Sequence, residues 1–129
     1  MVNYRLMTMK LALVLWFLLW ARIGLPWRGF QWTPTFRRVE LLPFAVGSTR
    51  TQTLNLLIFI PLGIIGTRLG WRPRTVMLVA LAVSGLTEIL QLFSTRRYPS
   101  TTDLILNTAG ALIGLAIARG RKAGRTHGR

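Results

Sequence analysis

Four long apolar segments alternate with shorter polar segments along the chain. They predict helices over about residues 6–24, 54–69, 75–93 and 102–118, with a basic tail over 119–129. At a rise of 1.5 Å per residue, the third segment crosses most of a ~30 Å hydrocarbon core. The charge-free run of the fourth segment is shorter, so its flanks or neighbouring protein must complete its span. The pattern predicts a single all-α domain over residues 1–129, a polytopic membrane protein built as a bundle of four transmembrane helices.

The first apolar segment has a competing interpretation as a signal peptide. Arg5 and Lys10 precede a short apolar core, as in secretory signals. No small-residue cleavage site of the A-x-A type follows, and the sequence Ala21-Arg22-Ile23 is a poor substitute. We therefore expect an uncleaved helix, with Lys10 extending its side chain to the interface.

The connection over about residues 22–53 contains prolines, glycines and several aromatic residues among five arginines. Continuous helix is disfavoured by that many proline and glycine positions. Aromatic and arginine side chains are typical of the membrane interface, so we expect this loop to lie against lipid headgroups. Residues 41–46 are short and apolar enough to form an amphipathic or re-entrant piece.

The charge of the chain adds to this picture. Lysine and arginine number 17 against three acids, and the net charge is +14. Such an excess indicates nucleic-acid or membrane partners. The basic residues sit at the edges of the apolar blocks rather than along a helix face, so we expect membrane lipids as partners and no nucleic acid. The chain has no cysteine, and its one histidine, His127, lies in the basic tail, so we expect neither a catalytic triad, a metal nor a cofactor.

With four spans, both termini and the loop between the second and third helices share one side of the membrane. More basic residues flank that side than the other, counted over the short loops and the two ends. The positive-inside rule then places both termini in the cytoplasm, with the protein as a multi-pass membrane component.

Several polar residues occur in or beside the apolar segments, where lipid disfavours them. Glu88 lies within the third segment, at a cost of roughly 2.5–3.5 kcal/mol for a charged carboxylate. Gln91 follows on the same helix face, and the fourth segment repeats the pattern with Asp103 and Asn107. Topology brings these residues and Asn55 to one depth near the outer surface. The predicted polar cluster comprises Asn55, Glu88, Gln91, Arg96, Arg97, Asp103 and Asn107, and the predicted loop contacts are Arg37, Arg38, Pro43 and Phe44.

Structural roles compete with a functional one at the acidic positions. Asp103 stands where a carboxylate caps a helix N-terminus and interacts favourably with its dipole. Glu88 and Gln91 suit an internal clamp that binds helices together, through Arg96 or Arg97.

The amide and loop positions have structural alternatives as well. Asn55 and Asn107 suit hydrogen bonds between helices. Arg37 and Arg38 suit a pair of side chains that faces solvent or lipid headgroups.

Small residues predict where helices approach closely. Gly110 and Gly114 form a G-x-x-x-G pair on one face of the fourth helix, and Gly63 adds a small position in the second. This face suits packing within one chain or against a second copy, which leaves oligomerisation open. Pro61 predicts a kink in the second helix and a freed carbonyl that needs another donor.

The order of these motifs resembles one protein family. The run NLLIFIPLG over residues 55–63, EILQLF over 88–93 and RYPSTTDLILNTAGALIG over 97–114 are similar to the VanZ-like family. The LPF run over 42–44 is similar to its short motif after the first helix. Some family members carry an acid where Ser100 stands here. The resemblance implies a polytopic bacterial membrane protein, from a family whose founding member is associated with low-level resistance to teicoplanin.

These observations support three hypotheses. The favoured one is a non-enzymatic factor at the outer leaflet that contacts lipid-linked wall precursors or lipoglycopeptides, with Arg37 and Arg38 on phosphates. The second is a small intramembrane enzyme with Glu88 and Asp103 as catalytic acid and base or as ligands of one divalent cation. The third is a membrane scaffold in which the polar residues only lock the helices together.

Overall fold

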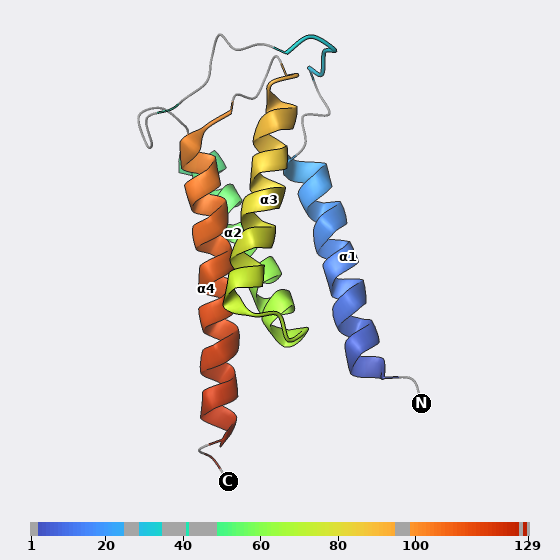
Figure 1. The fold of residues 1–129 in the computed structure, drawn as a ribbon, viewed down its shortest axis with the longest axis vertical. Coiled ribbons are helices and arrows are strands. Elements are labelled where there is room, and N and C mark those ends of the chain that lie inside the picture. The colour runs from blue at the N-terminus through green and yellow to red at the C-terminus, as the bar shows by residue number, and fades with distance from the viewer. Residues whose placement is uncertain are drawn as a thin grey trace.

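A computed structural model describes residues 3–24, 29–34, 41, 49–94, 99–126 and 128. Within these ranges the chain is all-α and has no β-strand, although Phe30 and Ser94 form an isolated antiparallel β-bridge. The four helices are α1 (Tyr4–Gly24), α2 (Thr49–Arg68), α3 (Pro73–Gln91) and α4 (Thr101–Thr126). Both termini lie at the same end of the bundle (Figure 1). The four helices and the absence of strands among the described residues confirm the predicted all-α class.

Two helices extend beyond the apolar segments that predicted them. α2 begins at Thr49 rather than near residue 54, and α4 continues to Thr126, through most of the segment predicted as a basic tail. Hydropathy marks the part of a helix that suits lipid, whereas backbone hydrogen bonding continues into water. Arginine, lysine and alanine are good helix formers and favour the continuation of α4, although Gly120 and Gly124 oppose it.

A tight turn joins α2 to α3 and makes them a helical hairpin. The backbone N–H of Trp71 donates to the carbonyl of Gly66 (2.9 Å), and that of Gly70 to the carbonyl of Thr67 (3.1 Å). This pair of bonds is a Schellman motif, which needs a left-handed residue after the helix, and Gly70 has a φ of 85°. Pro73 then opens α3, because its missing N–H has no partner in the first turn of a helix anyway.

Close packing of α2 on α4 rests on three glycines. A Cβ added at Gly110 or Gly114 would overlap a backbone carbonyl of α2, and one added at Gly63 would overlap the carbonyl of Ala111 in α4. Small residues permit this backbone approach, which drives helix association in lipid. The G-x-x-x-G face therefore serves a contact within one chain, the first of the two roles that the sequence left open.

α1 attaches to α2 through tryptophan. Trp16 and Trp20 are buried, and the indole of Trp16 packs edge-on against Phe59 at 5.7 Å between ring centroids. Its Nε1–H donates to the carbonyl of Ile58 (2.6 Å). Pro61 lacks the N–H that would bond the adjacent carbonyl of α2, so the indole supports the helix where its own hydrogen bonding is weakest.

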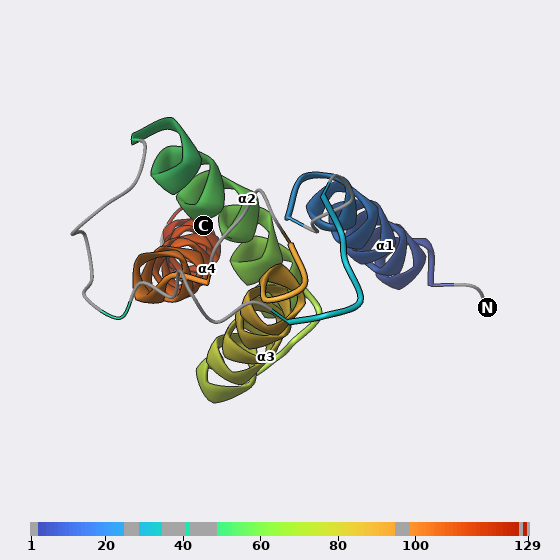
Figure 2. The same ribbon diagram turned by 90° about the horizontal axis from the view of Figure 1, so that it is seen from above.

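Three of the helices, α1, α3 and α4, are long and apolar enough to cross a membrane. Their outer faces expose many large apolar side chains, including Leu15, Leu18, Leu78, Leu86 and Ile113. Extensive exposed apolar surface of this kind marks a membrane-facing protein. The remaining helix, α2, packs against each of the other three and lies between α1 and α4 when viewed from above (Figure 2). The result is a multi-pass membrane protein in which α2 contacts all three other helices and still exposes part of its surface, including Leu54 and Leu57.

Candidate functional site

A narrow cavity between the four helices collects the polar residues of the membrane region. Its lining comprises Trp20, Ile23, Asn55, Ile58, Phe59, Thr87, Glu88, Gln91, Asp103 and Asn107. About 10 Å³ is open to the centre of a water molecule, which is room for one water or one small ion. The structure thus brings together all five polar residues that the sequence placed near this depth in α2, α3 and α4.

The cavity has a half-buried rim and a buried floor. Asn55, Glu88 and Asp103 are half-buried, whereas Gln91 and Asn107 are only 2% and 4% exposed. The aromatic and aliphatic side chains of the lining exclude water, which strengthens electrostatic interactions inside. Glu88 and Asp103 are thus less buried as whole residues than Gln91 and Asn107, although the Oε1 of Glu88 is itself buried.

Glu88 ties the end of α3 to the start of α4. Its Oε2 accepts a hydrogen bond from the backbone N–H of Ser100 (2.6 Å), the residue directly before α4. The carbonyl of Ser100 in turn accepts from the N–H of Asp103 (3.1 Å) in the first turn. A negative charge beside a helix N-terminus is favourable, because free N–H groups and the helix dipole point at it. Glu88 is thus a clamp between helices, with a backbone N–H as a partner.

Asp103 occupies the first turn of α4, as a helix-capping carboxylate does. It also lines the cavity. Among the described lining residues there are two carboxylates and no lysine, arginine or histidine. Two carboxylates in one narrow cavity favour a cation or a ligand that donates hydrogen bonds.

The floor of the cavity contains two buried amide oxygens. The Nδ2 of Asn107 donates to the Oγ of Ser84 (2.8 Å), which is the interhelical bond that the sequence offered as an alternative. The Oδ1 of Asn107 and the Oε1 of Gln91 are buried and accept no hydrogen bond from the residues that the structure describes. A buried oxygen without a donor costs roughly 1–3 kcal/mol. Both oxygens can accept from a water molecule, from an N–H or O–H of a ligand, or coordinate a cation.

Two polar residues of this region were missed by the sequence reasoning as part of the site. These residues are Ser84 and Thr87 in α3. The spacing of Ser84, Thr87, Glu88 and Gln91 places them on one face of α3, and that periodicity is the signal that would have found them.

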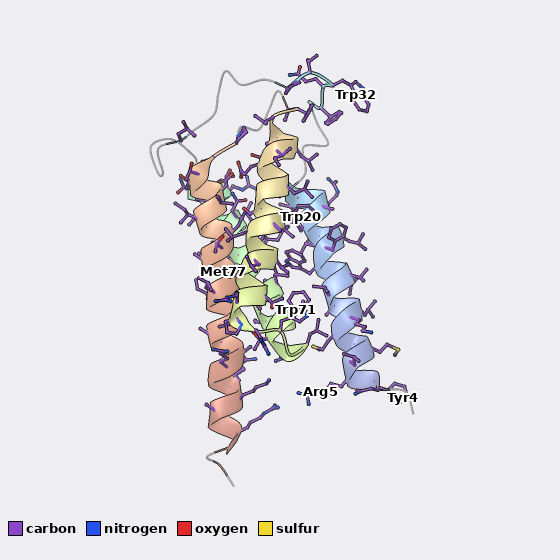
Figure 3. The ribbon with its side chains drawn as sticks, viewed as in Figure 1. Tyr4, Arg5, Trp20, Trp32, Trp71 and Met77 are labelled. Atoms are coloured by element: carbon purple, nitrogen blue, oxygen red, sulfur yellow. The ribbon has the colours of Figure 1, made fainter. Side chains whose placement is uncertain are left out.

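An aromatic segment over residues 29–34 lies at the same end as the cavity. The N–H of Gln31 donates to the carbonyl of Phe93 (2.7 Å), just beyond α3, and the rings of Phe30 and Phe93 stack. Trp32 is 88% exposed at the tip of the segment (Figure 3). An exposed tryptophan at a bundle end suits the membrane interface, in keeping with the expected headgroup contact of this loop.

The other predicted site residues lie outside the described residues. They are Arg37, Arg38, Pro43, Phe44, Arg96 and Arg97. The predicted re-entrant piece over 41–46 lies outside as well, apart from Leu41, which is exposed.

One comparison with known proteins gives a match. The model of the VanZ/LLP1 family matches residues 7–122, which include all four helices in whole or in large part. No curated protein and no solved structure matches the chain.

Proposed function

The chain belongs to the VanZ/LLP1 family, and from that premise we propose that it acts at the outer face of the bacterial cytoplasmic membrane. In this proposal it is a non-enzymatic envelope factor that contacts lipid-linked wall precursors or lipoglycopeptides. Cells that contain it then tolerate glycopeptide antibiotics such as teicoplanin better. The observation that carries the proposal is the carboxylate-rimmed cavity at the end of the bundle opposite the termini.

The chemistry of the cavity narrows the group that it recognises. Carboxylate and amide oxygens accept hydrogen bonds, so they suit an ammonium, a hydroxyl or a peptide N–H. The cavity has room for one such group, so the rest of the ligand stays at the membrane surface. Sugar and peptide headgroups on lipids present these donors there, and the proposal assigns their phosphates to Arg37 and Arg38.

The proposal requires both termini in the cytoplasm. Because the chain has no cysteine, single substitutions Ser100→Cys and Thr126→Cys report the two ends separately. Intact cells are treated with a membrane-impermeant thiol reagent. Labelling at position 100 alone supports the outer location of the cavity, whereas labelling at position 126 alone inverts the protein and overturns the proposal.

The function is tested with Glu88→Gln and Asp103→Asn, which remove a charge and keep the side-chain shape. Each variant is expressed in a glycopeptide-sensitive bacterium, and teicoplanin tolerance is measured beside the protein level in the membrane. We expect tolerance to fall toward that of cells without the protein. Thr108→Val is the matched control, since Thr108 neighbours Asn107 in α4 but bonds the carbonyl of Leu104 outside the cavity lining.

Full tolerance in both charge variants at an equal protein level contradicts a role for the cavity in tolerance. A lower protein level with unchanged tolerance per molecule instead supports the scaffold hypothesis, in which the polar residues only join the helices.

A second candidate function is a small intramembrane enzyme that modifies a lipid-linked substrate. The buried oxygens of Gln91 and Asn107, beside the carboxylates of Glu88 and Asp103, favour it, because oxygen donors of this kind hold a divalent cation. The described residues contain no group of three acidic, histidine or cysteine side chains that could hold a metal, so the amides would have to complete the ligand set. Comparing envelope lipids with and without the protein decides this point. A gained or lost lipid species supports the enzyme, and an unaltered profile leaves the binding factor.

A further inference from the structure

A second charged cavity lies at the opposite end of the bundle, near both termini. It has a volume of about 350 Å³, and its lining comprises Arg5, Met9, Arg68, Ala118, Arg121, Lys122 and Arg125. The side chains come from α1, α2 and α4. An adjoining cavity of about 300 Å³ shares four of these residues and adds Asn3 and Leu6. The two cavities form one space between the start of α1 and the ends of α2 and α4, where Figure 3 labels Arg5.

This space lies at the level where the apolar run of each helix stops. Arg5 precedes the apolar run of α1, and Arg68 is the last residue of α2. In α4, Ala118 is the last residue before the basic turns begin. The cavity therefore sits at the boundary between the hydrocarbon core and the headgroups, whichever way the protein is inserted.

The charges around the cavity lack compensation from the described lining. Five of the seven residues in the larger cavity are arginine or lysine, and none is acidic. Both described carboxylates, Glu88 and Asp103, line the cavity at the other end of the bundle. Cations that converge from three helices repel one another, and an anion between them removes that repulsion.

The helices leave space here because α1 is anchored elsewhere. Its buried tryptophans, Trp16 and Trp20, hold the half that is far from Arg5. Toward its N-terminus α1 diverges from α4, and Met7 and Leu11 are exposed (Figure 1). A ligand in this gap would join α1 to α4, which otherwise meet little at this end.

We propose that this space binds the phosphate group of an anionic phospholipid, with Arg5 on one side and Arg121, Lys122 and Arg125 on the other. A guanidinium group can donate two parallel hydrogen bonds to the oxygens of one phosphate. Basic pockets between helices at the headgroup level suit lipid phosphates. The inner wall favours a lipid over a free phosphate, because Leu6, Met9 and Ala118 provide apolar contacts for glycerol and acyl carbons. The proposal stands apart from the function of the carboxylate cavity.

The test uses the full chain purified in a zwitterionic detergent. Phosphatidylglycerol or cardiolipin is titrated in, phosphatidylcholine serves as the neutral lipid, and native mass spectrometry counts the bound lipids. We expect one anionic lipid to bind with preference over phosphatidylcholine. Arg5→Gln and Arg121→Gln should each weaken it about fivefold, which corresponds to about 1 kcal/mol per basic residue near a lipid headgroup.

The control variants are Arg74→Gln and Arg119→Gln. Both residues are exposed and basic at the same end, and neither lines the cavity. We expect them to leave the affinity within about twofold, since their charges act only through screened long-range attraction. Equal weakening by all four substitutions overturns a built site and leaves a general electrostatic attraction.

Competition with inorganic pyrophosphate distinguishes recognition of the lipid from recognition of a soluble phosphate. Displacement of the lipid by pyrophosphate at a similar concentration shows that the phosphate alone is recognised and overturns the lipid assignment. Persistence of the bound lipid supports it. Absence of any preference for anionic over neutral lipid overturns the proposal entirely.

Discussion

The two ends of the bundle differ in how they hold their charges. At the end away from the termini, the carboxylates of Glu88 and Asp103 border a cavity with room for about one water molecule. At the other end, arginine and lysine side chains surround a larger space and are all exposed. Exposed basic side chains are solvated in any arrangement, whereas buried oxygens need partners in fixed positions. The carboxylate end therefore depends on exact helix placement, and the basic end tolerates variation.

The largest expected effect comes from the packing that holds both ends in place. Gly114→Ala places a methyl group into the backbone of α2 at Ile60, and we expect a loss of about 3 kcal/mol of stability, since overpacking against backbone is poorly relieved. Gly120→Ala is the matched control in the same helix, because nothing lies within 4 Å of its added Cβ. It should stabilise the helix, by up to about 1 kcal/mol. Thermal unfolding in detergent micelles measures both, and equal stabilities would contradict the observed α2–α4 packing.

Substitutions of Glu88 should have an intermediate effect on stability, and they test whether the carboxylate end and the basic end are independent. Glu88→Leu leaves the N–H of Ser100 without its acceptor, and we expect a loss of about 1–3 kcal/mol of stability. Glu88→Gln keeps an acceptor in the same position and should lose less than half of that. Both variants should bind anionic lipid like the unmodified protein, as measured by native mass spectrometry. Weaker lipid binding in either folded variant would show that the two ends are coupled.

The smallest effect is expected at the exposed aromatic residues. Trp32 at the carboxylate end and Tyr4 at the basic end are 88% and 72% exposed, so neither contributes much to packing. Trp32→Ala and Tyr4→Ala should each change the unfolding free energy in micelles by no more than about 0.5 kcal/mol. A larger loss in Trp32→Ala would show that the aromatic segment over residues 29–34 stabilises the end of α3.

The carboxylate end shows how much of the site could be predicted from the sequence. Apolar runs and the charges between them predicted the helices, and the alternation of direction predicted that Asn55, Glu88 and Asn107 would come to one depth. The pairing of side chains was beyond reach, because it depends on the rotation of each helix about its axis. The sequence offered Arg96 or Arg97 as partners of Glu88, whereas the structure gives a bond to the backbone N–H of Ser100. What the cavity binds stays a prediction.

The number of transmembrane helices shows a second limit of prediction from the sequence. Hydropathy predicted four transmembrane helices. Three of the described helices, α1, α3 and α4, are long and apolar enough to cross a membrane, and α2 is the one that is not among them. A helix that packs against several others can keep a polar residue such as Asn55, which is half-buried and lines the cavity between the helices. Hydropathy averages the preference of a segment's side chains for lipid or water. It does not show which other helices the segment will contact.

By itself, the sequence determined the class of the protein, the approximate position of each helix and the end at which the polar residues of the membrane region gather. These features follow from the separate preferences of each segment for lipid, water or the interface, which act along the chain. Tertiary structure alone decided that Gly63, Gly110 and Gly114 bring α2 against α4, that one cavity is small and acidic, and that basic side chains from three helices surround another. Those features depend on contacts between residues far apart in the chain, and the local preferences that place a helix do not specify which of its faces meets another.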